Sequence, residues 1–167
     1  MSDLLALLTE FAGGRVALVE RHEGSARAVS NYDFNNTYQY IISRGETHLS
    51  WLQNALAEYK AAVPPAGAAA LPAAVSPKTS KKIEASAFRS ILDDDARYLG
   101  AFVDAWRARV DGVTHARHRN MLNVILGESL EHKRLFEQAA TGIEDLLGRR
   151  TDGAERVGGV LPTRWLE

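Results

Sequence analysis

The stretch DFNNTYQYIISRGETHLSWLQNALAEY, residues 33–59, decides the fold class of this chain. Every three to four residues it places a side chain on one stripe that is mainly apolar, which is typical of an amphipathic helix. Near its middle the stripe is interrupted by His48. Because a polar group buried in a helical core must be paired or must bind something, His48 is the first candidate functional residue. The stripe consists of Phe34, Tyr38, Ile41, Gly45, His48, Leu52, Ala55 and Tyr59.

Two further stretches carry an apolar stripe with one strongly polar interruption. The first contains GESLEHKRLFEQA, residues 127–139, and is interrupted by His132; the second is interrupted by Asp95. Each stripe is expected to face a core. Their members are Leu122, Ile125, Ser129, His132, Phe136, Ala139, Ile143 and Leu146, and Phe88, Leu92, Asp95, Leu99, Phe102 and Trp106.

The whole pattern predicts an all-α chain with four helices, over about 2–22, 33–59, 80–113 and 114–147. Ser2 and Thr114 are the expected N-caps, Gly148 is the expected stop of the last helix, and Gly13 with Gly14 should weaken the first. No hairpin turn lies between alternating β-branched residues, so strand signals are poor.

The connections indicate how these helices are arranged. Short links join the first helix to the second and the third to the fourth, which favours two antiparallel hairpins. Between the hairpins lies AAVPPAGAAALPAAVSPKTS, residues 61–80, whose prolines exclude a regular helix. It fits a crossover over about 60–79 that runs the length of one four-helix bundle, residues 1–147. The alternative is a flexible linker between two hairpin domains, each of which would bury too little apolar surface.

Composition narrows the function classes. The net charge of −1 argues against nucleic acid and against an anionic membrane, and no run of residues is long and apolar enough to span a bilayer. The chain has no Cys, which excludes thiolate metal sites and is compatible with the cytoplasm. Residues 148–167 form a Gly-rich tail with an apolar end, which we expect to dock on the bundle or on a protein partner.

The three interruptions are expected to meet. Counted from the bends near residues 27 and 114, His48, His132 and Asp95 lie about 21, 18 and 19 residues away. If the crossover places both bends at one end of the bundle, these residues share one level.

Carboxylates are expected to join that level. Glu128, one turn before His132, would join it, as would Glu10 on the first helix, while Glu46 flanks His48 and points partly away. His22, His115 and His118 would lie together near the bends. There they would either be solvated at the end of the bundle or form a site for a stray divalent ion.

The chain resembles the ferritin-like superfamily in its four helices, in its long second crossover, and in RGETHLSWLQNAL, residues 44–56, with GESLEHKRLFEQA. In that family, helices two and four each carry Glu-x-x-His, and helices one and three each supply one carboxylate. The resemblance implies a ferritin-like antiparallel bundle with His48 and His132 as motif histidines, Asp95 as the third-helix carboxylate and Glu10 as the first-helix one.

The two motif glutamates are missing, because Gly45 and Ser129 occupy their positions. Glu46 and Glu128 stand one position away, about 100° around the helix. A di-iron centre is therefore not expected. The residues that remain suit one Fe, Zn or Mn ion, held by His48, His132 and Asp95 with Glu128, Glu10 or Glu46 as auxiliaries.

Two function hypotheses follow, and the sequence leaves both open. In the first, the bundle binds a metal and is an iron-dependent oxidoreductase or iron-handling protein. A metal site like that of the DinB-like family is a related possibility. That family typically has two histidines at His-x-x-x-His spacing, and Glu128-x-x-x-His132 is the only similar spacing in this sequence. In the second, the polar residues are structural, with Asp95 pairing with His132, and the chain is an interaction module that acts through its surface and tail. In either case a homodimer is expected by analogy.

Overall fold

The computed structural model describes residues 2–74 and 85–142, and the prediction of an all-α chain with four helices is confirmed there. Within those ranges it contains no strand. The helices are α1 (Ser2–Ala28), α2 (Tyr32–Ala57), α3 (Ala85–Asp111) and α4 (Ala116–Ala140), with a short 3-10 turn, η1 (Gly67–Ala69), between α2 and α3. The apolar tail expected at residues 148–167 lies outside the described residues.

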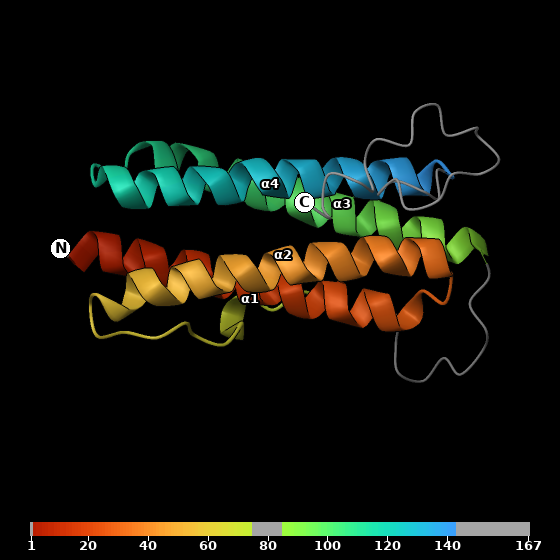
Figure 1. Ribbon diagram of the computed structural model, residues 1–167, viewed down its shortest axis with the longest axis horizontal. Helices are drawn as coiled ribbons and strands as arrows, with labels where there is room; N and C mark the ends of the chain where they lie inside the picture. The colour runs from red at the N-terminus through yellow and green to blue at the C-terminus, as the bar shows by residue number, and fades with distance from the viewer. Residues whose placement is uncertain (1, 75–84, 143–167) are drawn as a thin grey trace, which may run out of the picture.

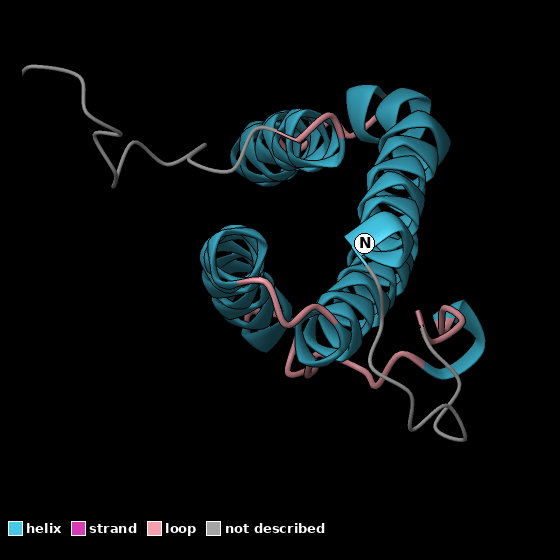
Figure 2. Ribbon diagram, turned by 90° about the vertical axis from the view of Figure 1, so that its right-hand side faces the viewer, coloured by secondary structure: helices cyan, strands magenta, loops and turns pink. Residues whose placement is uncertain are grey.

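The four helices surround one interior. Figure 1 shows α2 returning alongside α1, and α4 returning alongside α3. Besides these two pairs, α1 contacts α3 and α2 contacts α4, whereas α1 with α4 and α2 with α3 form the diagonals. The view along the bundle in Figure 2 shows the helices around a common interior rather than in one layer. Side chains from all four helices therefore meet in a single core.

The described part of the connection between α2 and α3 runs along α1. A Cβ built on Gly13 would lie 3.6 Å from Pro64 Cγ, and further along α1 the Arg21 guanidinium donates a hydrogen bond to the carbonyl oxygen of Pro72. The connection therefore follows α1 for at least eight residues of that helix. Its last expected residues, 75–79, lie outside the described ranges.

The expectation that both bends share one end of the bundle is wrong. In Figure 1 the turn between α1 and α2 lies at the right and the turn between α3 and α4 at the left. The physical reason is simple: α2 ends at the left and α3 begins at the right, so α3 finishes far from the first turn. His22, near the end of α1, is consequently far from His115 and His118 at the start of α4.

Helix ends differ from the sequence prediction by a few residues. α1 runs through Gly13 and Gly14 and continues to Ala28, and a Cβ on Gly14 would lie only 3.1 Å from the Phe102 ring. Tertiary contact thus outweighs low helix propensity. His115, not Thr114, caps α4 by accepting a long hydrogen bond, 3.4 Å, from the backbone of His118. α4 ends at Ala140, before the Gly148 that was expected to stop it.

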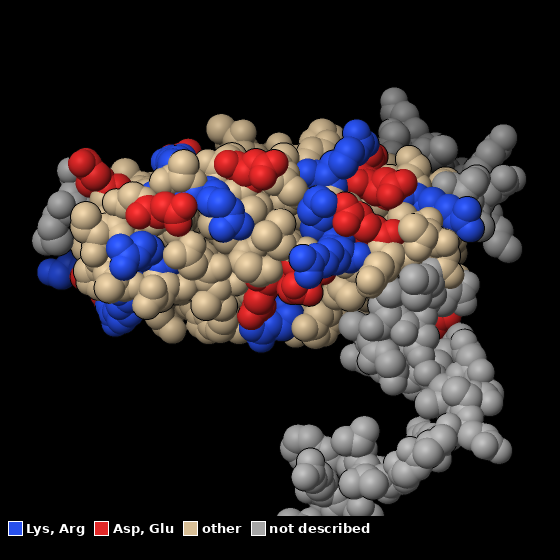
Figure 3. Space-filling view, turned by 90° about the horizontal axis from the view of Figure 1, so that it is seen from above, with Lys and Arg blue, Asp and Glu red and all other residues tan. Residues whose placement is uncertain are grey.

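The stripes read from the sequence are the faces that pack inward. Every described member of the three stripes is buried except Tyr59, which is half-buried. On the face drawn in Figure 3, basic and acidic side chains alternate without a large area of one sign. No helix among the described residues is long and apolar enough to cross a membrane.

Gly45 sets how closely α1 approaches α2. A Cβ at this position would lie 2.7 Å from Val19 Cγ2 and 3.5 Å from an Arg15 guanidinium nitrogen. The valine is buried and β-branched, so it has little freedom to move aside. Gly45 is therefore required by packing rather than by backbone conformation.

We expect Gly45→Ala to lower the free energy of unfolding by about 1–2 kcal/mol, since overpacking costs more than the helix propensity of alanine returns. Gly127→Ala is the matched control: Gly127 lies inside α4 with nothing within 4 Å of its built Cβ, so that variant should be slightly more stable than wild type. Urea denaturation measures both. A Gly45→Ala protein as stable as Gly127→Ala would refute the packing role.

Candidate functional site

The centre of the bundle holds a buried arginine that the sequence analysis did not identify. Arg15 of α1 is 1% exposed. One guanidinium nitrogen, Nη1, donates to Ser129 Oγ at 3.2 Å, and the other, Nη2, lies 3.1 Å from His48 Nδ1. The guanidinium also lies over the Phe102 ring, 5.6 Å from its centroid. Arg15 thus links α1 to α2 and α4 through their candidate motif positions.

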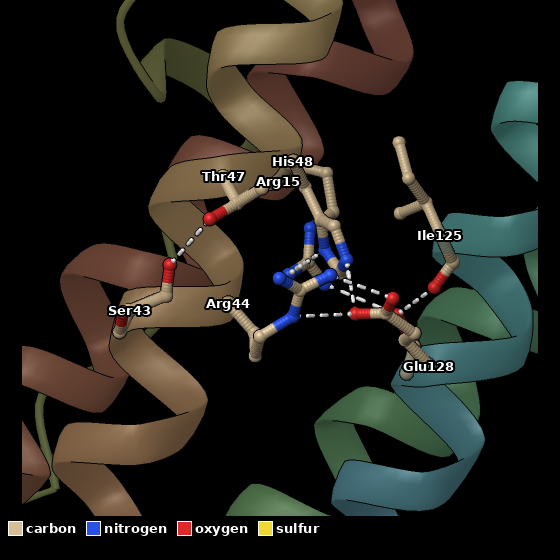
Figure 4. Close-up of polar contacts among 8 residues, drawn as sticks. Arg15, Ser43, Arg44, Thr47, His48, Ile125 and Glu128 are labelled. Carbon is tan, nitrogen blue, oxygen red and sulfur yellow. Dashed lines mark hydrogen bonds and ion pairs between the residues drawn. The ribbon is translucent and has the colours of Figure 1, made fainter. Parts of the chain in front are cut away.

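His48 uses both ring nitrogens. Because an arginine can only donate, His48 Nδ1 is the acceptor of the Arg15 bond, and its Nε2–H then donates to Glu128 Oε2 at 2.8 Å. Figure 4 shows Arg44 and His48 of α2 pointing toward Glu128 of α4. Arg44 completes the contact with two bonds to the Glu128 carboxylate, from Nη2 at 2.8 Å and from Nε at 3.0 Å.

Ser129 closes the network on the side of α4. Its hydroxyl accepts from Arg15 and donates to the carbonyl oxygen of Ile125 at 2.7 Å. A serine inside a helix commonly bonds the carbonyl four residues earlier, which orients its oxygen. Here that orientation presents a lone pair to the buried guanidinium. Ser129, which occupies one of the two positions where the motif glutamates are missing, is therefore a hydrogen-bond acceptor for Arg15.

His132 lies beside this network. Its ring is stacked on that of His48 with centroids 6.2 Å apart, and Tyr40 approaches its edge at 6.0 Å. The residue is 2% exposed, and no described residue forms a hydrogen bond with its Nδ1. Of the two motif histidines, His132 alone keeps a free buried nitrogen.

Charge in the cluster sits on the arginines and on Glu128. Burial lowers the pKa of Arg15 to about 10, so this guanidinium stays protonated near pH 7. Burial and the Arg15 charge lower the pKa of His48 to about 4 and that of His132 to about 3, so both imidazoles are neutral. Hydrogen bonding from Arg44 lowers the pKa of Glu128 to about 2.

Asp95 belongs to a second polar cluster. Its Oδ1 accepts from Arg21 Nε at 2.8 Å and its Oδ2 from the Tyr38 hydroxyl at 2.5 Å, so the expected pairing with His132 is wrong. Burial and the neighbouring Asp95 raise the pKa of Tyr38, which therefore remains a donor. Arg21 follows Arg15 on α1 by six residues, or about 9 Å of helix, which separates the two clusters.

The other predicted auxiliaries lie outside both clusters. Glu10 forms two bonds with Arg109 on the surface, where its side chain is 61% exposed. Glu46 is exposed on α2. Among the described residues, no three His, Asp or Glu side chains are arranged to hold a metal ion. The structure therefore brings together His48, Glu128 and His132, and separates Asp95, Glu10 and Glu46 from them.

A signal for Arg15 was present in the sequence. Leu8, Phe11, Arg15, Leu18 and His22 follow one another at helical spacing, and all are buried in the structure. The first helix therefore also carries an apolar stripe, with polar interruptions at Arg15 and His22. The dense apolar content of this segment hid the stripe, because its other faces also carry leucine and valine.

Comparison with protein-family models, with curated proteins and with solved structures finds no match for this chain.

Because His48 and His132 are buried and neutral, we expect acid to destabilise the fold. Their pKa values, about 4 and about 3, lie below the ordinary 6.5. Below pH 6.5 the unfolded chain therefore binds more protons than the folded one. The free energy of unfolding then decreases as the pH is lowered. For His48 alone we expect a loss of roughly 3 kcal/mol between pH 6.5 and 4. Urea denaturation at successive pH values measures it, and His48→Gln should flatten the dependence. An identical slope in His48→Gln would contradict this assignment.

We expect Glu128→Gln to lower the free energy of unfolding by about 1.5–3 kcal/mol, because it removes the charged acceptor shared by His48 and Arg44. Glu131→Gln is the matched control on the same helix: Glu131 is 66% exposed and pairs with the exposed Arg134. That change should stay within about 0.5 kcal/mol of wild type. Equal effects of the two substitutions in thermal or urea unfolding would show that the central cluster contributes no more than a surface pair.

Proposed function

We propose that this chain is a metal-free, ferritin-like antiparallel bundle that acts as an interaction module through its surface. Arg15 would supply the central positive charge that a metal ion supplies in the family that the sequence resembles. One observation carries the proposal: the guanidinium bonds Ser129 and lies 3.5 Å from the built Cβ of Gly45. Gly45 and Ser129 occupy the two positions where the motif glutamates are absent. Glycine leaves space for the arginine side chain, and serine accepts a hydrogen bond from it.

The hydrogen bonding of His48 supports the same proposal. A metal ligand must offer a nitrogen lone pair. The only lone pair of neutral His48 accepts from Arg15, while its other nitrogen carries the proton given to Glu128. A metal ion at this point would have to displace a protonated guanidinium and a charge-assisted bond. Arg44 meanwhile engages both oxygens of Glu128.

The second candidate is a single Fe, Zn or Mn ion at His132, Glu128 and His48, in an iron-dependent oxidoreductase or iron-handling protein. The free Nδ1 of the buried His132 favours it, since that nitrogen is available for coordination. This candidate requires Arg15 to leave the centre and Asp95 to play no part. A homodimer remains the proposed assembly under both candidates, and light scattering of the full chain tests it.

Metal analysis distinguishes the two candidates. The full chain, purified without chelator or nickel affinity, is incubated with Fe(II), Mn²⁺ or Zn²⁺, desalted and analysed by mass spectrometry beside His48→Ala and His132→Ala. We expect no metal whose binding depends on either histidine, and no Fe(II)-dependent oxygen consumption. Arg15→Met is the informative variant, because it clears the centre while filling the apolar space.

About one ion per chain in wild type, lost in both histidine variants, would reject the metal-free proposal in favour of the second candidate. Uptake that appears only in Arg15→Met would instead support the view that the arginine occupies the metal position. Circular dichroism on each variant confirms that the proteins compared are folded.

A further inference from the structure

A third group of polar residues, apart from the central cluster and the Asp95 cluster, lies where α2 ends and α4 begins. A cavity of about 230 Å³ opens between the two helices there. His118, in the first turn of α4, precedes Glu128 by ten residues, or about 15 Å of helix, so the two sites are separate. The cavity is lined by Trp51, Asn54, Ala55, Glu58, Arg117, His118 and Met121.

His118 is the unexplained residue of this cavity. The sequence predicted a solvated terminus or a stray-ion site for it, yet it is 2% exposed, and its ring lies near those of Tyr59 and His115. Its Nε2 is buried and has no hydrogen-bond partner within residues 2–74 and 85–142. A buried imidazole nitrogen without a partner costs free energy, so a bound group that satisfies it would stabilise the site.

The nearest acidic atom stands at a distance typical of shared metal coordination. His118 Nε2 lies 3.6 Å from Glu58 Oε2, which is too long for a hydrogen bond. Two donor atoms that each lie about 2.1 Å from one zinc ion are separated by roughly 3–3.5 Å. A small movement of the glutamate, which is 42% exposed at the end of α2, therefore brings both atoms into coordination.

We propose that Glu58 and His118 bind a divalent transition-metal ion, for which Zn²⁺ is the probe. Asn54 lines the same cavity one turn before Glu58 and offers an amide oxygen, and water completes the coordination. The exposed His115, whose ring is stacked 4.2 Å from that of His118, supplies a third protein ligand if its side chain rotates. Imidazole and carboxylate are donors that zinc accepts.

Charge near the site sets its strength. Burial and the neighbouring His115 lower the pKa of His118, so its imidazole is neutral and keeps a lone pair near pH 7. Arg117 competes for the same carboxylate, donating to both oxygens of Glu58. Both partners of that pair are well exposed, so it contributes little free energy and an ion displaces it.

Titration calorimetry of the chelator-treated full chain with Zn²⁺ tests the proposal. We expect one ion per chain, with affinity reduced at least about tenfold in His118→Ala and in Glu58→Gln. Arg117→Ala should bind more tightly than wild type, because it frees the carboxylate; general destabilisation would not produce that gain. Glu58→Gln changes an exposed side chain, so it remains informative if His118→Ala fails to fold.

His132→Ala is the control for position and should leave Zn²⁺ affinity unchanged. No Zn²⁺ binding by wild type, or binding that survives both His118→Ala and Glu58→Gln, overturns the proposed site. Binding lost in His132→Ala but kept in His118→Ala would overturn it together with the metal-free centre proposed above. Binding that follows the substitutions at 58 and 118 alone leaves the metal-free centre intact.

Discussion

The arrangement at the centre of this protein depends on one buried charge, the guanidinium of Arg15. An arginine buried without compensation would destabilise the bundle by several kcal/mol, so its neighbours must satisfy it. Ser129 accepts from its Nη1 and His48 from its Nη2, and Glu128 supports His48 in turn, whereas the Nε of Arg15 has no hydrogen-bond partner among the described residues. Gly45 contributes as well, because a side chain at this position would press against α1, the helix that carries Arg15. Residues that look unrelated in the sequence are thus parts of one electrostatic requirement.

The same network joins the two halves of the bundle. α1 packs mainly against α2, and α3 against α4, whereas the contact between α2 and α4 is less extensive. Across that smaller contact, Arg44 and His48 reach Glu128. Directional, charge-assisted bonds therefore add to apolar packing where packing is least extensive. This arrangement also specifies which faces of the two hairpins meet, because a rotation of either helix would leave buried polar atoms unpaired.

Most of the fold was predictable, and part of the site was. Helical periodicity identified four helices, and almost every described position that it assigned to the core is buried, because burial repeats with the period of the helix. It also singled out His48, His132 and Asp95 as buried polar residues. It could not say that Asp95 pairs with Arg21 and Tyr38, since partners on different helices depend on which end of the bundle each helix starts from. An error in that one point placed Asp95 on the level that His48 and His132 share.

The helices, their inward faces and the need for polar groups in the core to find partners can all be read from the sequence, because they follow from local periodicity and from the cost of burying polar atoms. The identity of those partners depends on how the helices pack. Arg15 reaches Ser129 across 114 positions of sequence, and His48 reaches Glu128 across 80. Such pairings are set by the direction of each helix and by the space that glycine and serine leave. Neither quantity is encoded in any single stretch of the chain.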